Sequence, residues 1–174
     1  MGPGTGDVVV RRIRPEDWAV TRSLRLRALA DAPDAFAKTY QEESVRPDTF
    51  WIDRAVVACT GKGIATFLAF DGHEPAGITT GIVDDAGQPQ LVSMWVDPAL
   101  RGRRLGESLV NAVVQWALNG GFERLSLWVS EDNGPAIRLY QRAGFQSTDR
   151  TDALRPGSEV RIRMWVRHST PSDL

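Results

Sequence analysis

The apolar side chains of this chain recur with two periods, which predict where its strands and helices lie. From Leu125 to Ser130 apolar residues alternate with mostly polar ones, as in a strand that buries one face. From Leu105 to Ala117 they recur every three or four positions, as on one face of a helix. On this basis strands are predicted over residues 8–13, 64–70, 75–83, 91–96, 125–129, 145–148 and 159–166, and helices over residues 16–31, 49–59, 102–119 and 135–142.

In chain order these elements are one strand, two helices, three strands, one helix, one strand, one helix and two strands. This order predicts an α/β (α+β) fold: a mixed, mostly antiparallel central sheet of about seven strands with helices on both faces. Short turns at residues 71–73 and 84–87 favour antiparallel neighbours. A length of 174 residues leaves room for one domain, predicted over residues 8–168 between flexible segments at 1–7 and 169–174.

Composition and charge exclude several classes of protein. The 21 basic and 22 acidic residues give a formal net charge of −1, so no global field attracts nucleic acid or an anionic membrane. The apolar runs are only a few residues long, too short for a membrane span. The N-terminus lacks the features of a secretory signal and the single Cys59 cannot form an intramolecular disulfide, so we expect a cytoplasmic location. Two histidines without paired spacing predict no metal site.

One stretch has the features of an anion site. Residues 96–106 (VDPALRGRRLG) run from the end of a predicted strand into the start of a predicted helix. The first amides of a helix lack internal partners and carry the positive end of its dipole, so a diphosphate binds well there. The alternative is a solvated arginine turn, and the glycine spacing fits neither a P-loop nor a GxGxxG turn. The stretch contains two glycines that let a ligand approach the backbone, Gly102 and Gly106. It also contains three arginines that add positive charge, Arg101, Arg103 and Arg104.

A second stretch, residues 133–145 (NGPAIRLYQRAGF), places an asparagine at a strand end and a tyrosine on the helix that follows. Together the two stretches resemble the GNAT-type N-acetyltransferase superfamily, whose acetyl-CoA motif is Q/R-x-x-G-x-G/A and whose next motif is approximately NxxAxxxYxxxGF. The resemblance extends over residues 8–167 in element order. It implies the acyl-CoA N-acyltransferase (GNAT) fold, in which the fourth and fifth strands splay apart.

One position departs from the family pattern. Arg104 stands where the motif usually has glycine. Its amide can still donate, but its side chain must point away from the pyrophosphate or contact it from outside.

The resemblance implies that acetyl-CoA lies in the gap between the splayed strands. The pantetheine arm is expected along residues 94–96, with an amide near Val96 that polarises the thioester carbonyl. Tyr140 matches the family's general acid, which protonates the leaving thiolate. Asn133 is expected to bind pantetheine or the attacking amine, to cap the next helix, or both. The predicted cofactor-binding residues are Met94, Trp95, Val96, Arg101, Gly102, Arg103, Arg104, Leu105, Gly106 and Asn133.

In this family the acceptor side of the cleft corresponds to residues 34–43 and the turn at 84–85. Phe36 and Tyr40 are predicted to wall a pocket there, and Glu42 and Glu43 to attract a cationic amine. Ordinary packing and surface charge explain the same residues equally well. The general base stays open between Glu42, Glu43, Asp97 and a water relay.

The sequence therefore predicts an acetyl-CoA-dependent N-acetyltransferase that transfers acetyl directly to a primary amine of a small molecule or a protein. We expect a monomer or homodimer with no metal, nucleic acid or membrane partner. The alternative is a non-catalytic acyl-CoA sensor or interaction module on the same fold. A nucleic-acid surface at residues 101–104 is a weaker third hypothesis, against which the net charge argues.

Overall fold

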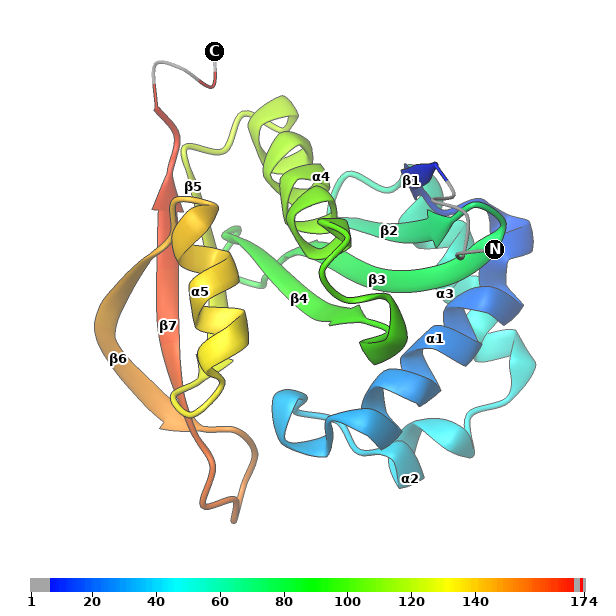
Figure 1. Cartoon of the computed structure of the whole chain (residues 1–174), viewed down its shortest axis with the longest axis horizontal. Coiled ribbons are helices and arrows are strands. Elements are labelled where there is room, and N and C mark those ends of the chain that lie inside the picture. Colours follow the sequence, from blue (N-terminus) through cyan, green and yellow to red (C-terminus); the bar gives the residue numbers. More distant parts are fainter. Residues whose placement is uncertain (1–6, 171–172, 174) are drawn as a thin grey trace, which may run out of the picture.

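The chain folds around one seven-stranded sheet (Figure 1). The structure is a computed structural model that describes residues 7–170 and residue 173. The strands lie in the order β1-β2-β3-β4-β5-β7-β6, and each neighbouring pair is antiparallel except β4 and β5, which are parallel. Their bounds are β1 Val8–Arg12, β2 Ile64–Asp71, β3 Glu74–Val83, β4 Pro89–Val96, β5 Arg124–Ser130, β6 Gln146–Ala153 and β7 Arg161–His168.

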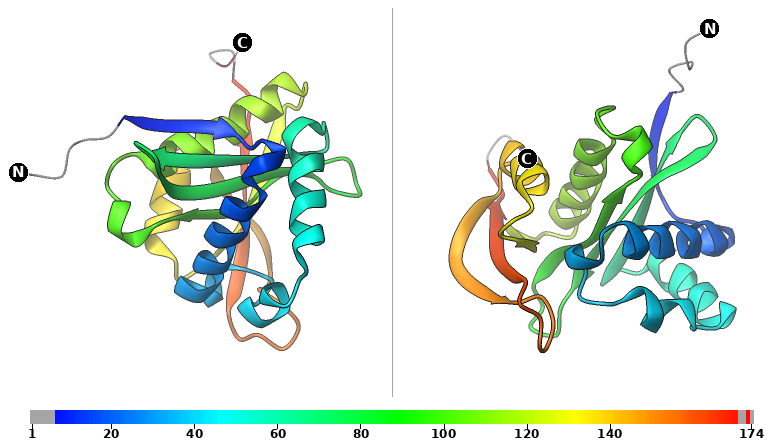
Figure 2. Two further views of the ribbon diagram at one scale, coloured as in Figure 1. Left: turned by 90° about the vertical axis from the view of Figure 1, so that its right-hand side faces the viewer. Right: turned by 60° about the horizontal axis from the view of Figure 1, so that its bottom comes forward.

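Helices cover both faces of the sheet, with α1 and α3 on one face and α4 and α5 on the other (Figure 2). Successive residues of β2 explain this arrangement, because Leu68 packs in the core with α1 and α3 whereas Ala69 packs in the core with α4. The helices are η1 Pro15–Asp17, α1 Trp18–Asp31, η2 Pro33–Ala35, α2 Tyr40–Ser44, α3 Asp48–Thr60, η3 Pro98–Leu100, α4 Leu105–Asn119 and α5 Gly134–Arg142.

Two glycines of β3 allow α4 to pack very closely on the sheet. A Cβ at Gly81 would lie 2.5 Å from Cε3 of Trp116 on α4, and one at Gly77 would lie 2.8 Å from the carbonyl oxygen of Trp95 and 3.0 Å from Cδ1 of Leu109. No real Cβ tolerates such distances, so glycine is required at both positions. The close packing fixes where the N-terminus of α4 lies relative to β4.

The sheet is split between β4 and β5. These strands pair at only two positions, Gln90 with Ser126 and Leu91 with Leu127, and then diverge. Just beyond the last pair, β4 has one extra residue opposite β3 and Ser93 has a φ of +58°, which marks a β-bulge. The backbone groups of β4 that face β5 beyond Leu91 therefore have no partner strand.

The predicted element order, mixed sheet and splayed strands are confirmed. The short helix α2 was not predicted, although its capping box between Thr39 and Glu42 is readable in the sequence. β6 reaches Ala153 rather than residue 148, because its polar, largely exposed side chains show no period. α3 begins at Asp48, one residue earlier than predicted.

The predicted domain boundaries stay a prediction, since the segments at 1–7 and 169–174 fall largely outside the described residues. Within the described ranges, no helix combines the length and the apolar character that a membrane crossing requires.

Candidate active site

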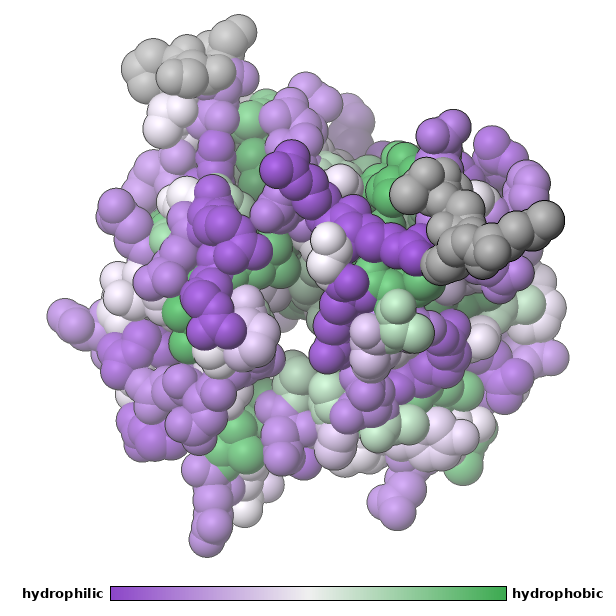
Figure 3. Space-filling view, in the orientation of Figure 1, coloured by the Kyte–Doolittle hydropathy of each residue, from purple (hydrophilic) through white to green (hydrophobic). Residues whose placement is uncertain are grey.

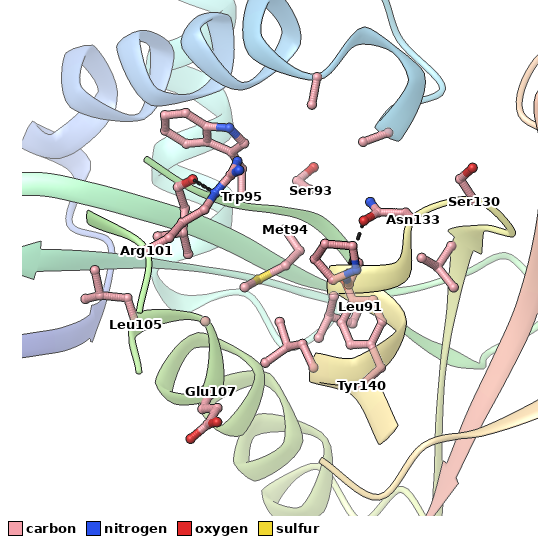
Figure 4. A pocket seen from close by; sticks show the side chains of 18 of the residues that line it. Leu91, Ser93, Met94, Trp95, Arg101, Leu105, Glu107, Ser130, Asn133 and Tyr140 are labelled. Carbon is pink, nitrogen blue, oxygen red and sulfur yellow. Dashed lines mark hydrogen bonds between the residues drawn. The ribbon is translucent and has the colours of Figure 1, made fainter. Parts of the chain in front are cut away.

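A cavity of about 700 Å³ opens where β4 and β5 diverge. The surface is hollowed at this place (Figure 3), and side chains from β4, α4 and α5 gather around the space (Figure 4). Its volume is in the range of small-molecule sites. We call the part beside residues 101–107 the α4 end, and the part beside residues 31–36 the α1 end.

The α4 end presents unpaired amides. In the described part of the chain, the backbone N–H groups of residues 102–107 donate no hydrogen bond, and Ser108 is the first amide to bond back, to the carbonyl of Arg104. All of these residues except Arg103 line the cavity, so the positive end of the α4 dipole lies beside it. The arrangement is suited to an anion with several oxygens.

Gly106 keeps this end open. A Cβ at this position would lie 3.2 Å from Cδ2 of Leu139 and 3.6 Å from Cε of Met94, so a larger side chain would fill the space between α4, α5 and β4. The unpaired amides and the narrow passage beside Gly106 fit a chain-like molecule that carries phosphates, which is the chemical character of coenzyme A.

Two of the three arginines in the loop before α4 are bound to protein carboxylates. Nη2 of Arg101 lies 3.2 Å from Oδ2 of Asp31, and its Nε donates to the carbonyl of Val96 at 3.3 Å. Arg103 pairs with Asp71 at the end of β2 and does not line the cavity.

Arg104 differs from both neighbours. Its side chain is exposed, lines the cavity and makes no ion pair within the described residues. Its φ of +60° lies in the left-handed region that favours glycine, which is the residue that the motif usually has here. Of the three predicted arginines, Arg104 is therefore the one whose charge is left for a ligand.

Tyr140 lies on α5, where it packs in the core and also lines the cavity. The side chain is 6% exposed and packs edge-on against Phe145, with ring centroids 5.9 Å apart. Among the described residues the hydroxyl has no hydrogen-bond partner, and Tyr140 lines the cavity wall. Burial raises the pKa of Tyr140 well above its usual value of about 10, so the hydroxyl is protonated at neutral pH.

Asn133 and β4 form the sides of the passage between the two ends. Oδ1 of Asn133 accepts from the Ala136 amide at 3.2 Å and caps α5, which leaves the side-chain NH₂ group facing the cavity (Figure 4). Met94 and Trp95 line the same passage from the unpaired stretch of β4. The carbonyl of Val96 already accepts a hydrogen bond from Arg101.

The α1 end combines one carboxylate with apolar walls. Oδ2 of Asp31 accepts from Nε1 of Trp95 at 2.9 Å as well as from Arg101. Phe36 is 6% exposed and forms the neighbouring wall. Arg155, from the loop between β6 and β7, donates to the carbonyls of Pro33 and Phe36 at 3.2 and 2.9 Å, which ties this loop to the segment after α1.

Three of the four predicted acceptor-side residues do not line this cavity; Phe36 is the one that does. Tyr40 is 46% exposed in a separate groove along α1. Glu42 caps α2, accepting from the Thr39 amide at 2.7 Å, and Glu43 is buried against Arg25. The reason is that the capping box folds this segment into α2, which turns its acidic side chains away from the cavity.

The remaining candidate base, Asp97, pairs with Arg27 and accepts from the Ala99 amide. Asp31 was not predicted as a cavity residue, because its partners lie 64 and 70 positions away in the chain. Ser93 was also missed, and a serine inside an apolar strand was the one available signal.

Comparison with known sequences identifies a family. Residues 25–145 match the sequence model described as the Acetyltransferase (GNAT) family. The chain is 31% identical over 145 residues to the mycothiol acetyltransferase of Salinispora arenicola, which covers 79% of this chain and 44% of that protein. It is 28% identical over 142 residues to the mycothiol acetyltransferase of Brachybacterium faecium, covering 80% of this chain and 40% of that one. The chain thus spans less than half the length of these relatives.

Solved structures share the fold at lower identity. An acetyltransferase of the GNAT family from Streptococcus pneumoniae superposes with a TM-score of 0.77 at 18% identity, covering 94% of this chain and 100% of that chain. The PaiA N-acetyltransferase from Thermoplasma acidophilum, solved in complex with coenzyme A, gives a TM-score of 0.73 at 16% identity, covering 94% and 99%. At these identities the likeness establishes the fold alone.

Proposed function

Because this chain belongs to the acetyltransferase (GNAT) family, we propose that it is an acetyl-CoA-dependent N-acetyltransferase that transfers acetyl directly to a primary amine. One observation supports the proposal. Residues from the unpaired edge of β4, residues at the start of α4 whose amides have no partner among the described residues, and Tyr140 all line the same cavity.

Each group of the cavity has a role in this reaction. Acetyl-CoA would supply an acetyl thioester; the amides of residues 102–107 would hold its phosphates, and the β4 edge beyond Leu91 would bind the amides of its pantetheine arm. As the amine nitrogen bonds to the acetyl carbon and the carbon–sulfur bond breaks, Tyr140 would give its proton to the departing sulfur and regain one from solvent. The amine loses its own proton to solvent.

The α1 end is the proposed entry for the acceptor. The carboxylate of Asp31 is already hydrogen-bonded by Trp95 and Arg101, so it is suited to orienting a donor group rather than to removing a proton. An amine with a pKa near neutrality needs little help to lose its proton, and we propose a small molecule with such an amine as the acceptor. Relatives named mycothiol acetyltransferase support a small-molecule acceptor. A cytoplasmic location and a monomeric or dimeric state belong to the same proposal.

A panel of amines tests the proposal. The protein is incubated with acetyl-CoA and, in turn, glucosamine, an alanyl dipeptide, spermidine and a lysine peptide, and release of the CoA thiol is measured. We expect turnover with at least one amine and raised thermal stability with acetyl-CoA. Stabilisation without thiol release for any amine would support a non-catalytic acyl-CoA sensor instead, and absence of both would overturn the coenzyme A site.

A further inference from the structure

A buried ion pair lies behind the α1 end of the cavity. Arg25 of α1 is 8% exposed and Glu43 of α2 is 5% exposed, and Nε of Arg25 lies 3.4 Å from Oε2 of Glu43. Neither residue lines the cavity. Taking two charges out of water is costly, and well-packed apolar side chains often serve stability as well. Stability alone is therefore a poor explanation for this pair.

Arg25 also contacts two residues that do line the cavity. Its Nη1 lies 3.4 Å from Oγ of Ser93, and its Cζ lies 5.0 Å from the centre of the Phe36 ring. A guanidinium is planar and carries five donors, so it can bind a carboxylate, a hydroxyl and the face of a ring at once. The orientation of Arg25 therefore links Glu43 to both walls of the α1 end.

Ser93 is the residue of β4 whose backbone most needs support. Its φ of +58° is unfavourable for a residue with a side chain, and it lies two positions beyond Leu91, where β4 loses its partner strand. The strand β5 cannot hold this bulge in place. Two side-chain hydrogen bonds among the described residues reach this stretch: the one from Arg25 to Ser93, and the one from Thr79 Oγ1 to the Val92 carbonyl at 3.4 Å.

We propose that Arg25, oriented by Glu43, is a positioning residue that fixes the Ser93 bulge and the Phe36 ring and so sets the geometry of the α1 end. The effect on acetyl transfer rests on the proposed function. The fixing of the bulge is a property of the protein without ligand, and it can be measured even if no acceptor is found.

The main test removes both charges together. In the double variant Arg25→Met/Glu43→Leu no buried charge is left unpaired, so the fold and its Tm should be kept. We expect amide hydrogen exchange at residues 92–95 to be about 10-fold faster or more, measured by mass spectrometry without ligand. With an amine found in the panel, kcat/KM should fall about 10-fold or more while the Kd for acetyl-CoA changes less than about 2-fold.

A second variant keeps the test valid if the double variant does not fold. Ser93→Ala deletes the hydroxyl but keeps the Cβ and the ion pair, and we expect faster exchange at residues 92–95 and a smaller loss of kcat/KM. The matched control is Arg11→Met/Asp17→Asn, which removes another ion pair (2.6 Å) between residues that do not line the cavity. The control variant should leave hydrogen exchange at residues 92–95 and kcat/KM unchanged.

The outcomes separate the two proposals. Wild-type exchange and wild-type kcat/KM in a folded double variant would overturn the positioning role and show that the pair only packs α2 against α1. A wild-type protein that acetylates no amine would count against the proposed function alone, and faster exchange in the variants would still support the positioning role.

Discussion

The α4 end of the cavity is built from backbone, whereas the α1 end is built from side chains of distant segments. At the α4 end the groups available to a ligand are unpaired amides between Gly102 and Glu107, and Gly106 leaves the space beside them open. At the α1 end Asp31 comes from α1, Phe36 from the segment after η2, and Ser93 from β4. Each of the three accepts a hydrogen bond from an arginine.

In the proposed function acetyl-CoA binds at the α4 end and the acceptor at the α1 end, so the two substrates meet different kinds of site. Backbone amides are present whatever the side chains are, so the proposed phosphate site does not require a glycine at position 104. Side chains held by long-range hydrogen bonds are specific to one sequence. We therefore expect substitutions at the α4 end to alter acetyl-CoA binding, and substitutions at the α1 end to alter acceptor use.

The largest expected effect comes from Tyr140, which lies between the two ends. Tyr140→Phe should lower kcat about 100-fold or more, because the leaving sulfur loses its proton donor, while the Kd for acetyl-CoA and the Tm stay close to wild type. Steady-state kinetics and calorimetry measure the three quantities.

The pH dependence of the wild-type protein provides a check on the same group. A raised pKa keeps the hydroxyl protonated, so kcat should show no alkaline decline due to Tyr140 below a pH of about 10. Wild-type turnover in the phenylalanine variant across the whole amine panel would remove Tyr140 from the mechanism.

Blocking the α4 end should have the next largest effect. In Gly106→Val the added methyl groups would meet Leu139 and Met94 and fill the passage, so the Kd for acetyl-CoA should rise about 10-fold or more, as measured by calorimetry. Gly106→Ala is the matched control, because its single methyl needs only a small shift of a flexible leucine. If the valine variant binds acetyl-CoA as tightly as wild type, the carrier does not pass Gly106.

A substitution at the α1 end should weaken use of the acceptor much more than binding of acetyl-CoA. Asp31→Asn keeps the size of the side chain but removes the charge that binds Arg101, so the KM for the acceptor should rise about 5-fold and the Kd for acetyl-CoA should stay within about 2-fold. Equal changes in both constants would mean that the two ends are not independent. Initial rates with each substrate varied in turn decide the point.

The smallest effect is expected at Arg104. Arg104→Gly should relieve the left-handed backbone and raise the Tm by about 2–4 °C, which corresponds to about 1 kcal/mol in a chain of this size. It should also raise the Kd for acetyl-CoA a few-fold at low salt, because an exposed cation is lost from the α4 end.

The reciprocal control is Gly102→Ala. Gly102 has a φ of +86° and open space around its missing Cβ, so only backbone strain should change and the Tm should fall. A glycine variant at 104 that is less stable than wild type would show that the arginine side chain contributes more than its backbone conformation costs.

The sequence predicts the α4 end well because that end is local. One short stretch holds the strand before residue 97, the turn through Gly102 and the helix from Leu105 onward. The strand and the helix are predicted by their hydrophobic periodicity, and the turn by its glycine. The split between β4 and β5 followed from the family resemblance rather than from the pattern itself. Apart from the polarity of Ser93, nothing in the local sequence indicates a bulge at this position.

The α1 end could not be predicted in the same way. Arg25 meets a carboxylate 18 positions away and a hydroxyl 68 positions away, and such contacts appear only once the helices pack on the sheet. The acidic pair Glu42 and Glu43 shows the risk of reasoning from composition. Glu42 is exposed but caps α2 and pairs with Lys38, and Glu43 is buried against Arg25, so neither carboxylate lies in the cavity.

The hydrogen bonds of Arg155 join two distant parts of the chain beside the α1 end. By donating to the carbonyls of Pro33 and Phe36, this guanidinium fastens the loop between β6 and β7 to the segment that carries Phe36, about 120 positions earlier in the chain. An outward movement of the Phe36 segment would therefore have to break both of these bonds or carry the β6–β7 loop with it.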